Sequence, residues 1–239
     1  MRTAPDQWPT PSDETAGVFH VAGVDLPVCY RPSSGARGSG GDWYDIFPPN
    51  DGGLVVVIGD VAGHGNGAVA AAAAMRTIIR GQLRKRAPLH GVFATVTAIV
   101  GDRAPYFATA VMLHVDRPRW RLGYLSAGHP CALVRRPGGT VDSLDAVQHP
   151  PIGVPYEAGP LTYDRIEPGT LVLAYTDGLV ERRERSIVDR IGLLAKTFAE
   201  IEPTADLNDA LRVIVDVARR PDEDGEPLDD DVAAILIRT

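Results

Sequence analysis

The alternation of apolar and polar residues predicts a strand-rich chain. Strands are indicated where apolar residues alternate with polar ones, or run without interruption for a few residues, between glycine, proline or aspartate. Ten segments fit this description, the first of them as one strand or as a bent pair. They are Val18–Tyr30, Trp43–Phe47, Leu54–Ile58, Tyr106–Val115, Trp120–Ala127, Ala132–Arg136, Thr140–Leu144, Leu161–Ile166, Leu171–Tyr175 and Val232–Arg238.

Apolar residues recur at helical spacing in four other segments. The first is rich in alanine from Ala68 to Met75 and continues to Leu83, which predicts a small-sided helix that packs closely on a sheet. The other three predicted helices are Leu89–Val100, Ile187–Phe198 and Leu207–Ala218.

Short connections rich in glycine and proline predict which strands are neighbours. The sequence Asn50-Asp51-Gly52-Gly53 predicts a hairpin between the second and third strands. The turns at residues 128–130 and 167–169 likewise predict that the strands on either side of each turn pair antiparallel. Many strands with helices between them suit an α+β fold of two stacked antiparallel sheets with helices on the outer faces.

Length and composition fit one globular domain. The chain has 239 residues, of which 44% are apolar and 23% charged, and this is enough for one full core. Residues 1–16 contain three prolines and no signal-peptide pattern, so we expect a flexible arm followed by a domain over residues 17–239. No segment approaches the roughly eighteen apolar residues of a membrane span.

Charge and cysteine content limit the kinds of partner and the cellular compartment that we expect. A formal net charge of −7 without a basic stripe argues against a nucleic-acid partner, because phosphate binding depends on Lys and Arg. The two cysteines, Cys29 and Cys131, both lie in apolar segments. We therefore expect reduced, buried thiols and a cytoplasmic protein.

Aspartates stand where predicted strands begin or end, in four separated segments: Asp42 with Asp45, Asp60, Asp177 and Asp230. Aspartate is common in turns, which explains any one of them. Four together favour a metal site, because aspartate is depleted in strands and is costly to bury unpaired. Carboxylates suit Mn²⁺ or Mg²⁺, and no His/Cys cluster has the spacing of a zinc site.

Six motifs occur together along the chain. They are Gly40-Gly41-Asp42-Trp43-Tyr44-Asp45, Gly59-Asp60-Val61-Ala62-Gly63-His64-Gly65, Ser126-Ala127-Gly128-His129-Pro130, Pro151-Ile152-Gly153-Val154, Tyr175-Thr176-Asp177-Gly178-Leu179-Val180-Glu181 and Asp230-Asp231-Val232-Ala233. In this order they resemble the metal-dependent serine/threonine protein phosphatases (PPM), specifically the bacterial SpoIIE/RsbU branch, over about residues 17–238. The resemblance implies an α-β-β-α sandwich and hydrolysis of phosphoserine or phosphothreonine in proteins.

The resemblance also implies a ligand set for two Mn²⁺ or Mg²⁺ ions, with Asp60, Asp42 and Asp177 as the catalytic group. Asp60 would bridge the ions, and the backbone carbonyl of Val61 would bind one of them. Asp42 would reach them directly or through water. Asp177 and Asp230 would complete the coordination of one of the two ions. The reaction implied is in-line attack on phosphorus by a water that the metals activate.

Several roles stay open in the sequence. The ligand assigned to Asp230 could shift by one residue, because Asp229 and Asp231 flank it. Asp45 is a further candidate ligand. His64 is either a general acid or a histidine at the start of a helix that bonds to backbone. His129 is expected to stabilise the fold rather than to act in catalysis.

The resemblance implies a phosphorylated STAS-domain protein, an anti-anti-sigma factor in a partner-switching pathway, as substrate. Regulation would come from a separate protein, or the activity would be constitutive. The alternative is a non-catalytic module of the same fold that only binds regulatory proteins. A nucleotide-binding loop at residues 59–65 is excluded, because no lysine follows the glycines as a Walker loop requires.

Overall fold

The fold consists of two stacked β-sheets between two pairs of helices. The computed structural model describes residues 15–21, 24–32, 40–48, 53–100, 106–144, 148–181, 186–202, 204–220 and 230–239. The first sheet has the strand order β1 (Thr15–Val21), β2 (Val24–Arg31), β12 (Val232–Arg238), β11 (Leu171–Tyr175), β7 (Leu133–Arg135) and β8 (Val141–Ser143). The second has the order β10 (Thr162–Arg165), β6 (Arg121–Ala127), β5 (Ala108–Asp116), β4 (Leu54–Val61) and β3 (Trp43–Phe47), with β9 (Gln148–His149) beside β6.

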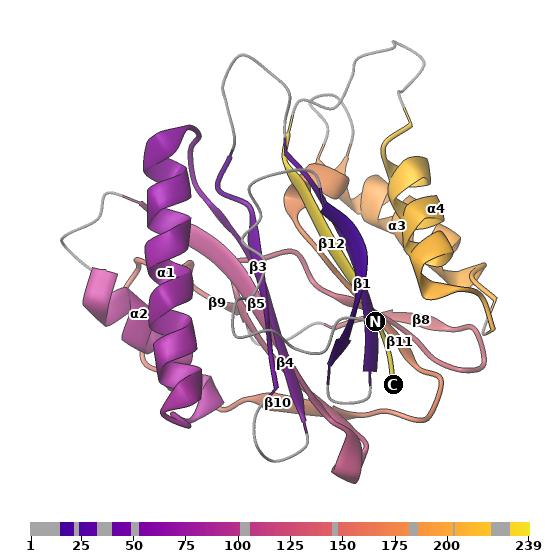
Figure 1. The fold of residues 1–239 in the computed structure, drawn as a ribbon, viewed down its shortest axis with the longest axis horizontal. Helices are drawn as coiled ribbons and strands as arrows, with labels where there is room; N and C mark the ends of the chain where they lie inside the picture. The colour runs from indigo at the N-terminus through magenta and orange to yellow at the C-terminus, as the bar shows by residue number, and fades with distance from the viewer. Residues whose placement is uncertain are drawn as a thin grey trace.

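The helices cover the outer faces of the sandwich. Figure 1 shows α1 (Asn66–Arg84) and α2 (Val92–Val100) on one side, and α3 (Ile187–Ala199) and α4 (Leu207–Ala218) on the other. The described residues also form the short 3₁₀ helices η1 (Leu89–Gly91), η3 (Arg117–Arg119) and η4 (Asp177–Leu179). In the described part of the chain, no helix combines the length and the apolar character needed to cross a bilayer. The predicted α-β-β-α sandwich is confirmed.

Three apolar layers hold the sandwich together. Strand β4 illustrates them, because Val56 and Ile58 face the layer between the sheets while Val55 and Val57 pack under α1 and α2. A strand covered on both faces needs an unbroken apolar run, which is what β4 has. The third layer lies between the first sheet and α3 and α4, where α4 contributes the apolar face predicted from its spacing: Leu207, Leu211, Ile214, Val215 and Ala218.

The predicted hairpin between β3 and β4 is confirmed by its register, in which Trp43 pairs with Gly59 and Phe47 with Val55. Its turn, at residues 49–52, lies outside the described residues. The first predicted segment is a pair of antiparallel strands, β1 and β2. Strand β1 starts at Thr15, so it includes the last two residues of the segment predicted as an arm.

Two of the predicted strand pairings are wrong. Strands β6 and β7 on either side of residues 128–130 belong to different sheets, and so do β10 and β11 on either side of residues 167–169. Turn residues show that a chain reverses direction, but they do not show which strand it then pairs with. Stacked sheets lie about 10 Å apart, and a few extended residues of about 3.3–3.6 Å each span that distance. The chain therefore crosses between sheets at both turns.

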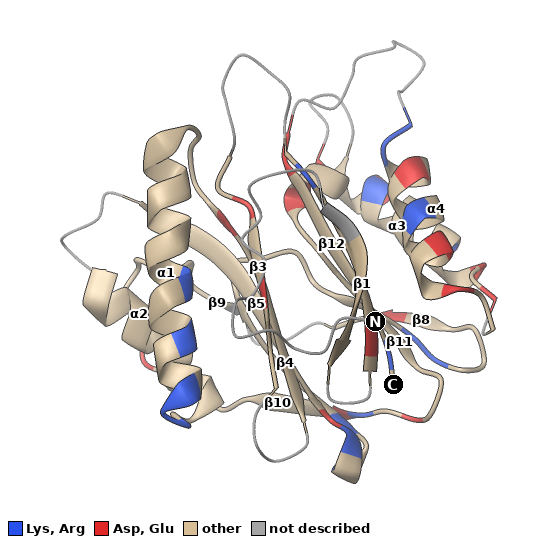
Figure 2. Cartoon of the chain, viewed as in Figure 1, with Lys and Arg blue, Asp and Glu red and all other residues tan. Residues whose placement is uncertain are grey.

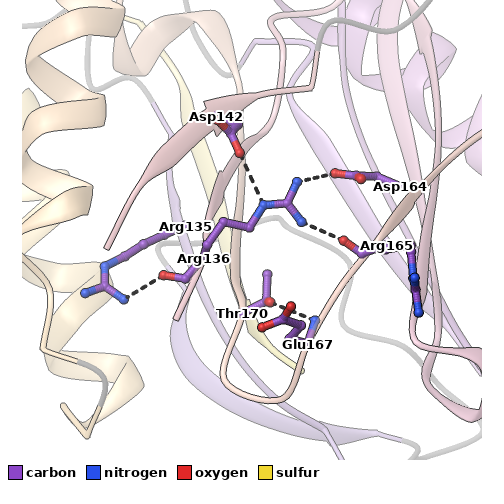
Figure 3. Close-up of polar contacts among 7 residues, drawn as sticks. All are labelled: Arg135, Arg136, Asp142, Asp164, Arg165, Glu167 and Thr170. Atoms are coloured by element: carbon purple, nitrogen blue, oxygen red, sulfur yellow. Dashed lines mark hydrogen bonds and ion pairs between the residues drawn. The ribbon is translucent and has the colours of Figure 1, made fainter. Parts of the chain in front are cut away.

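Arg136 joins the two sheets at one edge of the sandwich (Figure 3). Its guanidinium donates to Asp142 beside β7 at 3.2 Å, to the carbonyl oxygen of Arg165 in β10 at 2.6 Å, and to the carboxylate of Asp164. Strands β8 and β10 are the edge strands of their sheets. One side chain thus satisfies acceptors on both edges, and its planar donor fork suits this arrangement.

We predict that Arg136→Ala lowers the free energy of unfolding by about 1–3 kcal/mol, because three charge-assisted hydrogen bonds are lost, of which those to Arg165 and Asp164 join the two sheets. Urea denaturation followed by circular dichroism measures the change. Arg212→Ala is the matched control. Among the described residues Arg212 pairs with exposed Asp209 on the surface of α4, so the change should alter stability by less than about 0.5 kcal/mol. Equal losses in the two variants would contradict the assigned role.

Candidate active site

Three aspartates from distant parts of the sequence meet at one end of the sandwich. Carboxylate oxygens of Asp42, Asp60 and Asp177 all lie within 4.8 Å of one another. Asp42 immediately precedes β3, Asp60 lies near the end of β4, and Asp177 starts η4 just after β11. In Figure 2 acidic segments gather at the end of the sandwich where β12 begins. The predicted convergence of these three side chains is confirmed.

Glycines allow the strand ends to approach closely at this point. A Cβ atom at Gly41 would overlap the backbone of Val61, whose N–H donates to the Gly41 carbonyl at 3.2 Å. A Cβ atom at Gly178 would overlap the carbonyl oxygen of Asp231. These positions require glycine because two backbones touch there, and the contacts bring the aspartates together.

Asp42 is oriented by a hydrogen bond from the other sheet. The hydroxyl of Thr176, which follows β11, donates to Asp42 Oδ2 at 2.7 Å. The same hydroxyl oxygen accepts the N–H of Ala233 in β12 at 2.9 Å. Thr176 is fully buried and Asp42 is 6% exposed, so the bond is shielded from water and fixes the carboxylate.

Asp230 and Asp231 occupy different environments at the start of β12. Asp231 is buried, and its Oδ2 accepts the N–H of Gly40 at 2.7 Å. Asp230 is exposed, its Oδ1 accepts the N–H of Asp231 at 2.9 Å, and its charge acts on Asp60 and Asp177. Asp231 therefore holds the backbone before β3. Asp230 is not among the three aspartates whose oxygens meet, but it is near enough for its charge to act on Asp60 and Asp177. Asp229 lies outside the described residues.

Crowding of negative charge changes the acidity of the group. Burial, followed by the charge of Asp60, raises the pKa of Asp42 well above its usual range. Burial and the charges of Asp177 and Asp230 raise the pKa of Asp60 to about 8. Burial and the charge of Asp230 raise the pKa of Asp177 to about 6. Without a counter-charge, these carboxylates repel one another at neutral pH.

This donor set fits a hard divalent cation. The ligand atoms within reach are carboxylate oxygens, which Mg²⁺ and Mn²⁺ prefer. A bound cation also removes the repulsion that raises the three pKa values. The structure brings Val61 beside the group, at the end of β4 and against Gly41, while its carbonyl as a ligand remains a prediction.

Asp45 lies outside the group. It is buried on β3, and its two carboxylate oxygens accept from Arg80 of α1, with Nη2 to Oδ1 at 3.0 Å. In β3 the side chains alternate, so Tyr44 and Ile46 face the layer between the sheets and Asp45 faces α1. This structural ion pair explains the aspartate without a metal.

The two histidines of the motifs also have defined places. His64 is exposed, beside Gly40 in an isolated bridge just before α1, and the contacts of the described residues assign it no catalytic partner. His129 is buried between the sheets, with one ring nitrogen 2.8 Å from the Thr109 hydroxyl and the other 3.1 Å from the carbonyl oxygen of Tyr175. This placement agrees with a role in the fold.

Thr176 was missed as a site residue in the sequence, and Asp231 was named only as a neighbour to which the assignment of Asp230 could shift. Thr176 directly precedes Asp177, and Asp231 directly follows Asp230, so adjacency to a predicted ligand was the available signal. Their partners, Asp42 and Gly40, are far away in sequence. Only the pairing of distant strands shows these bonds.

The sandwich is the fold of solved PP2C phosphatase domains. Two similar solved structures are the RsbU and RsbW domains of Rv1364c from Mycobacterium tuberculosis (TM-score 0.75, 24% identity, 94% of this chain and 61% of that one), and the PP2C phosphatase domain with a regulatory fragment of SpoIIE from Bacillus subtilis (TM-score 0.72, 16% identity, 90% of this chain and 63% of that one). At these identities the likeness shows the fold.

Sequence comparison gives the family. Residues 50–239 match the family model described as Stage II sporulation protein E (SpoIIE), and the chain belongs to this family. Phosphoserine phosphatase RsbP of Bacillus subtilis (strain 168) is 29% identical over 173 residues, which cover 66% of this chain and 40% of RsbP. The chain thus spans about two fifths of the length of that relative. The resemblance to the SpoIIE/RsbU branch is confirmed.

The raised pKa values predict how the metal-free protein responds to pH. A carboxyl whose pKa is raised by folding binds more protons in the native state than in the unfolded state, so its contribution to stability falls as pH rises. For Asp60 this fall extends from about pH 4, near the pKa of an unfolded carboxyl, to about pH 8, its pKa in the folded protein. We predict that Asp60→Asn is more stable than the wild type at pH 8 in a chelator, by about 1 kcal/mol, and that the difference shrinks toward pH 4.

Chemical denaturation at several pH values measures this difference. Asp209→Asn, a change of an exposed carboxyl on α4, is the control and should show no such pH dependence. A metal-free Asp60→Asn variant less stable than the wild type at pH 8 would contradict the repulsion.

Proposed function

We propose that this chain is a metal-dependent phosphatase that hydrolyses phosphoserine or phosphothreonine in a protein substrate. The observation that carries the proposal is the meeting of Asp42, Asp60 and Asp177 within 4.8 Å. Family membership supports the same reaction. RsbP, as its name states, is a phosphoserine phosphatase.

The roles proposed for the residues follow from their surroundings. Asp60 and Asp177 are partly exposed, so they can face both an ion and an entering phosphate group. Asp42 is buried and fixed by Thr176, which suits a ligand whose position must not change. Asp230, which precedes β12, and the carbonyl of Val61 complete the proposed ligand set.

Two Mg²⁺ or Mn²⁺ ions are the proposed cofactors. RsbX, whose structure was solved in complex with magnesium, shares the fold with a TM-score of 0.70, 13% identity and coverage of 94% of this chain. When bound, such ions supply a water of lowered pKa and positive charge opposite the phosphoryl oxygens. The aspartates hold and orient that charge, and their own net negative charge favours divalent over monovalent cations.

The proposed substrate is a phosphorylated STAS-domain protein that regulates a sigma factor. The motifs place the chain in the SpoIIE/RsbU branch, and one structural neighbour carries RsbU and RsbW domains together. We place the reaction in the cytoplasm, in keeping with buried Cys29 and partly exposed Cys131, which form no disulfide among the described residues. Control by a separate regulatory protein is part of the same proposal.

We predict that Mn²⁺-dependent release of phosphate from a phosphoserine STAS protein falls at least about 100-fold in Asp60→Asn and in Asp177→Asn, because each loses a charged ligand. A continuous phosphate assay with purified protein measures the rates. Asp45→Asn is the matched control, since Asp45 binds Arg80 instead, and should stay within a few-fold of the wild type. Activity that survives both ligand changes would end the proposal.

The alternative function is a binding module without catalysis. It predicts tight binding of the STAS protein with no release of phosphate at any Mn²⁺ or Mg²⁺ concentration. The complete group of three converging aspartates favours the enzyme, because a module that only binds has no need for carboxylates that repel one another.

The two aspartates that precede β12 give a separate prediction. Asp230→Asn should weaken Mn²⁺ binding about tenfold or more, because its charge acts on Asp177 of the proposed site. Asp231→Asn should weaken it less, since an amide oxygen still accepts the N–H of Gly40. Isothermal titration calorimetry with Mn²⁺ ranks the variants, and the reverse ranking would assign the ligand to Asp231.

A further inference from the structure

The chain passes from one sheet to the other between β6 and β7, and His129 lies in this crossing. Its ring is 3% exposed and fills the space between the sheets. One ring nitrogen, Nδ1, is 2.8 Å from the hydroxyl of Thr109 on β5 in the second sheet. The other, Nε2, is 3.1 Å from the carbonyl oxygen of Tyr175 at the end of β11 in the first sheet. A single imidazole therefore bonds to both sheets.

The protonation state of this ring follows from its partners. The Tyr175 carbonyl can only accept, so Nε2 carries the hydrogen and donates. Nδ1 then has a lone pair and accepts from the Thr109 hydroxyl. Burial lowers the pKa of His129 to about 3, which keeps the ring neutral at physiological pH. The two bonds thus have fixed directions.

The local backbone is shaped to place His129. The hydroxyl of Ser126 accepts the His129 N–H at 3.3 Å and donates to its carbonyl at 3.2 Å. Gly128 has φ of 66°, and a Cβ atom there would press on the ring of Pro151. The left-handed backbone and the close contact both require glycine. The segment that connects the sheets at residues 126–129 therefore has a defined backbone conformation, and this conformation fixes the position of His129.

Both partners of His129 adjoin the aspartate group. Thr109 is the direct cross-strand partner of Asp60 in the pairing of β5 with β4. Side chains of directly opposite residues lie on the same face, with Cβ atoms about 4.5–5.5 Å apart. Tyr175 is two residues before Asp177 and ends β11. His129 consequently ties the strand pair that carries Asp60 to the strand that leads into Asp177.

We infer that His129 is a positioning residue that sets the separation between Asp60 and Asp177, and thereby the affinity of the site for a divalent cation. The inference rests on the proposed metal site but concerns residues outside the ligand set. Its function is geometric: the ring spans the two sheets next to the point where their aspartates meet. Breaking either hydrogen bond should loosen one sheet edge against the other and weaken metal binding.

The test uses Thr109→Val, which keeps the shape of the side chain and removes the hydroxyl that donates a hydrogen bond to His129. We expect the dissociation constant for Mn²⁺, measured by isothermal titration calorimetry on the full chain, to rise about tenfold. Thr109→Ser restores a hydroxyl and should bind close to the wild-type value. Thr197→Val is the matched control, because the hydroxyl of Thr197 donates within α3, to the carbonyl of Leu193, and the change should leave Mn²⁺ binding unchanged.

Each result separates the inference from the proposed function. Weaker Mn²⁺ binding in Thr109→Val, with recovery in Thr109→Ser, supports the positioning role. Equal Mn²⁺ binding by the wild type and Thr109→Val overturns the inference and leaves the proposed function standing. This holds even if Thr109→Val and Thr197→Val lose thermal stability to a similar extent. A wild type that binds no Mn²⁺ overturns the proposed function and this inference with it.

Discussion

The repulsion among three carboxylates is the constraint on which the rest of the site depends. Asp42, Asp60 and Asp177 lie within 4.8 Å of one another and are partly or fully withdrawn from water. Burial, together with the negative charge of neighbouring carboxylates, raises their pKa values, because such a group does not fully ionise without a counter-charge. Contacts made by neighbouring residues have to keep such a group together. A divalent cation supplies the positive charge that balances it.

The contacts that hold the group run between the two sheets. Thr176 after β11 donates to Asp42 before β3, and Gly40 donates to Asp231 before β12. His129 adds a third tie between β5 and β11. Each tie crosses from one sheet to the other at the end where the apolar layer between the sheets meets the aspartates. At this end of the sandwich, polar side chains take the place of the apolar residues that fill the layer between the sheets. The geometry of the site is therefore set by how the sheets stack.

Much of the fold was predictable because local pattern determines it. The apolar run of β4 and the amphipathic face of α4 identify a buried strand and a covering helix from the sequence alone. The turn signal between β3 and β4 also indicated the pairing that places Asp42 near Asp60. Aspartates at strand ends were recognisable because their chemistry is out of place in a strand. Asp177 was identified as a site residue on the same grounds.

The remaining features depend on contacts between distant segments. The turns after β6 and β10 resemble hairpin turns in sequence, yet each leads to the other sheet. Asp45 resembles a ligand in sequence, and only the position of Arg80 on α1 shows that it forms an ion pair. The role of Thr176 and the bonds of His129 likewise require the stacking of two sheets, which no local pattern specifies.

The most direct measurement of the central claim is a crystal structure of the protein grown with Mn²⁺, with anomalous diffraction recorded at the manganese edge. The account predicts anomalous peaks among the carboxylates of Asp42, Asp60 and Asp177, at about 2.0–2.6 Å from their oxygens. Crystals grown in millimolar Mn²⁺ that show no peak among these three side chains would contradict it.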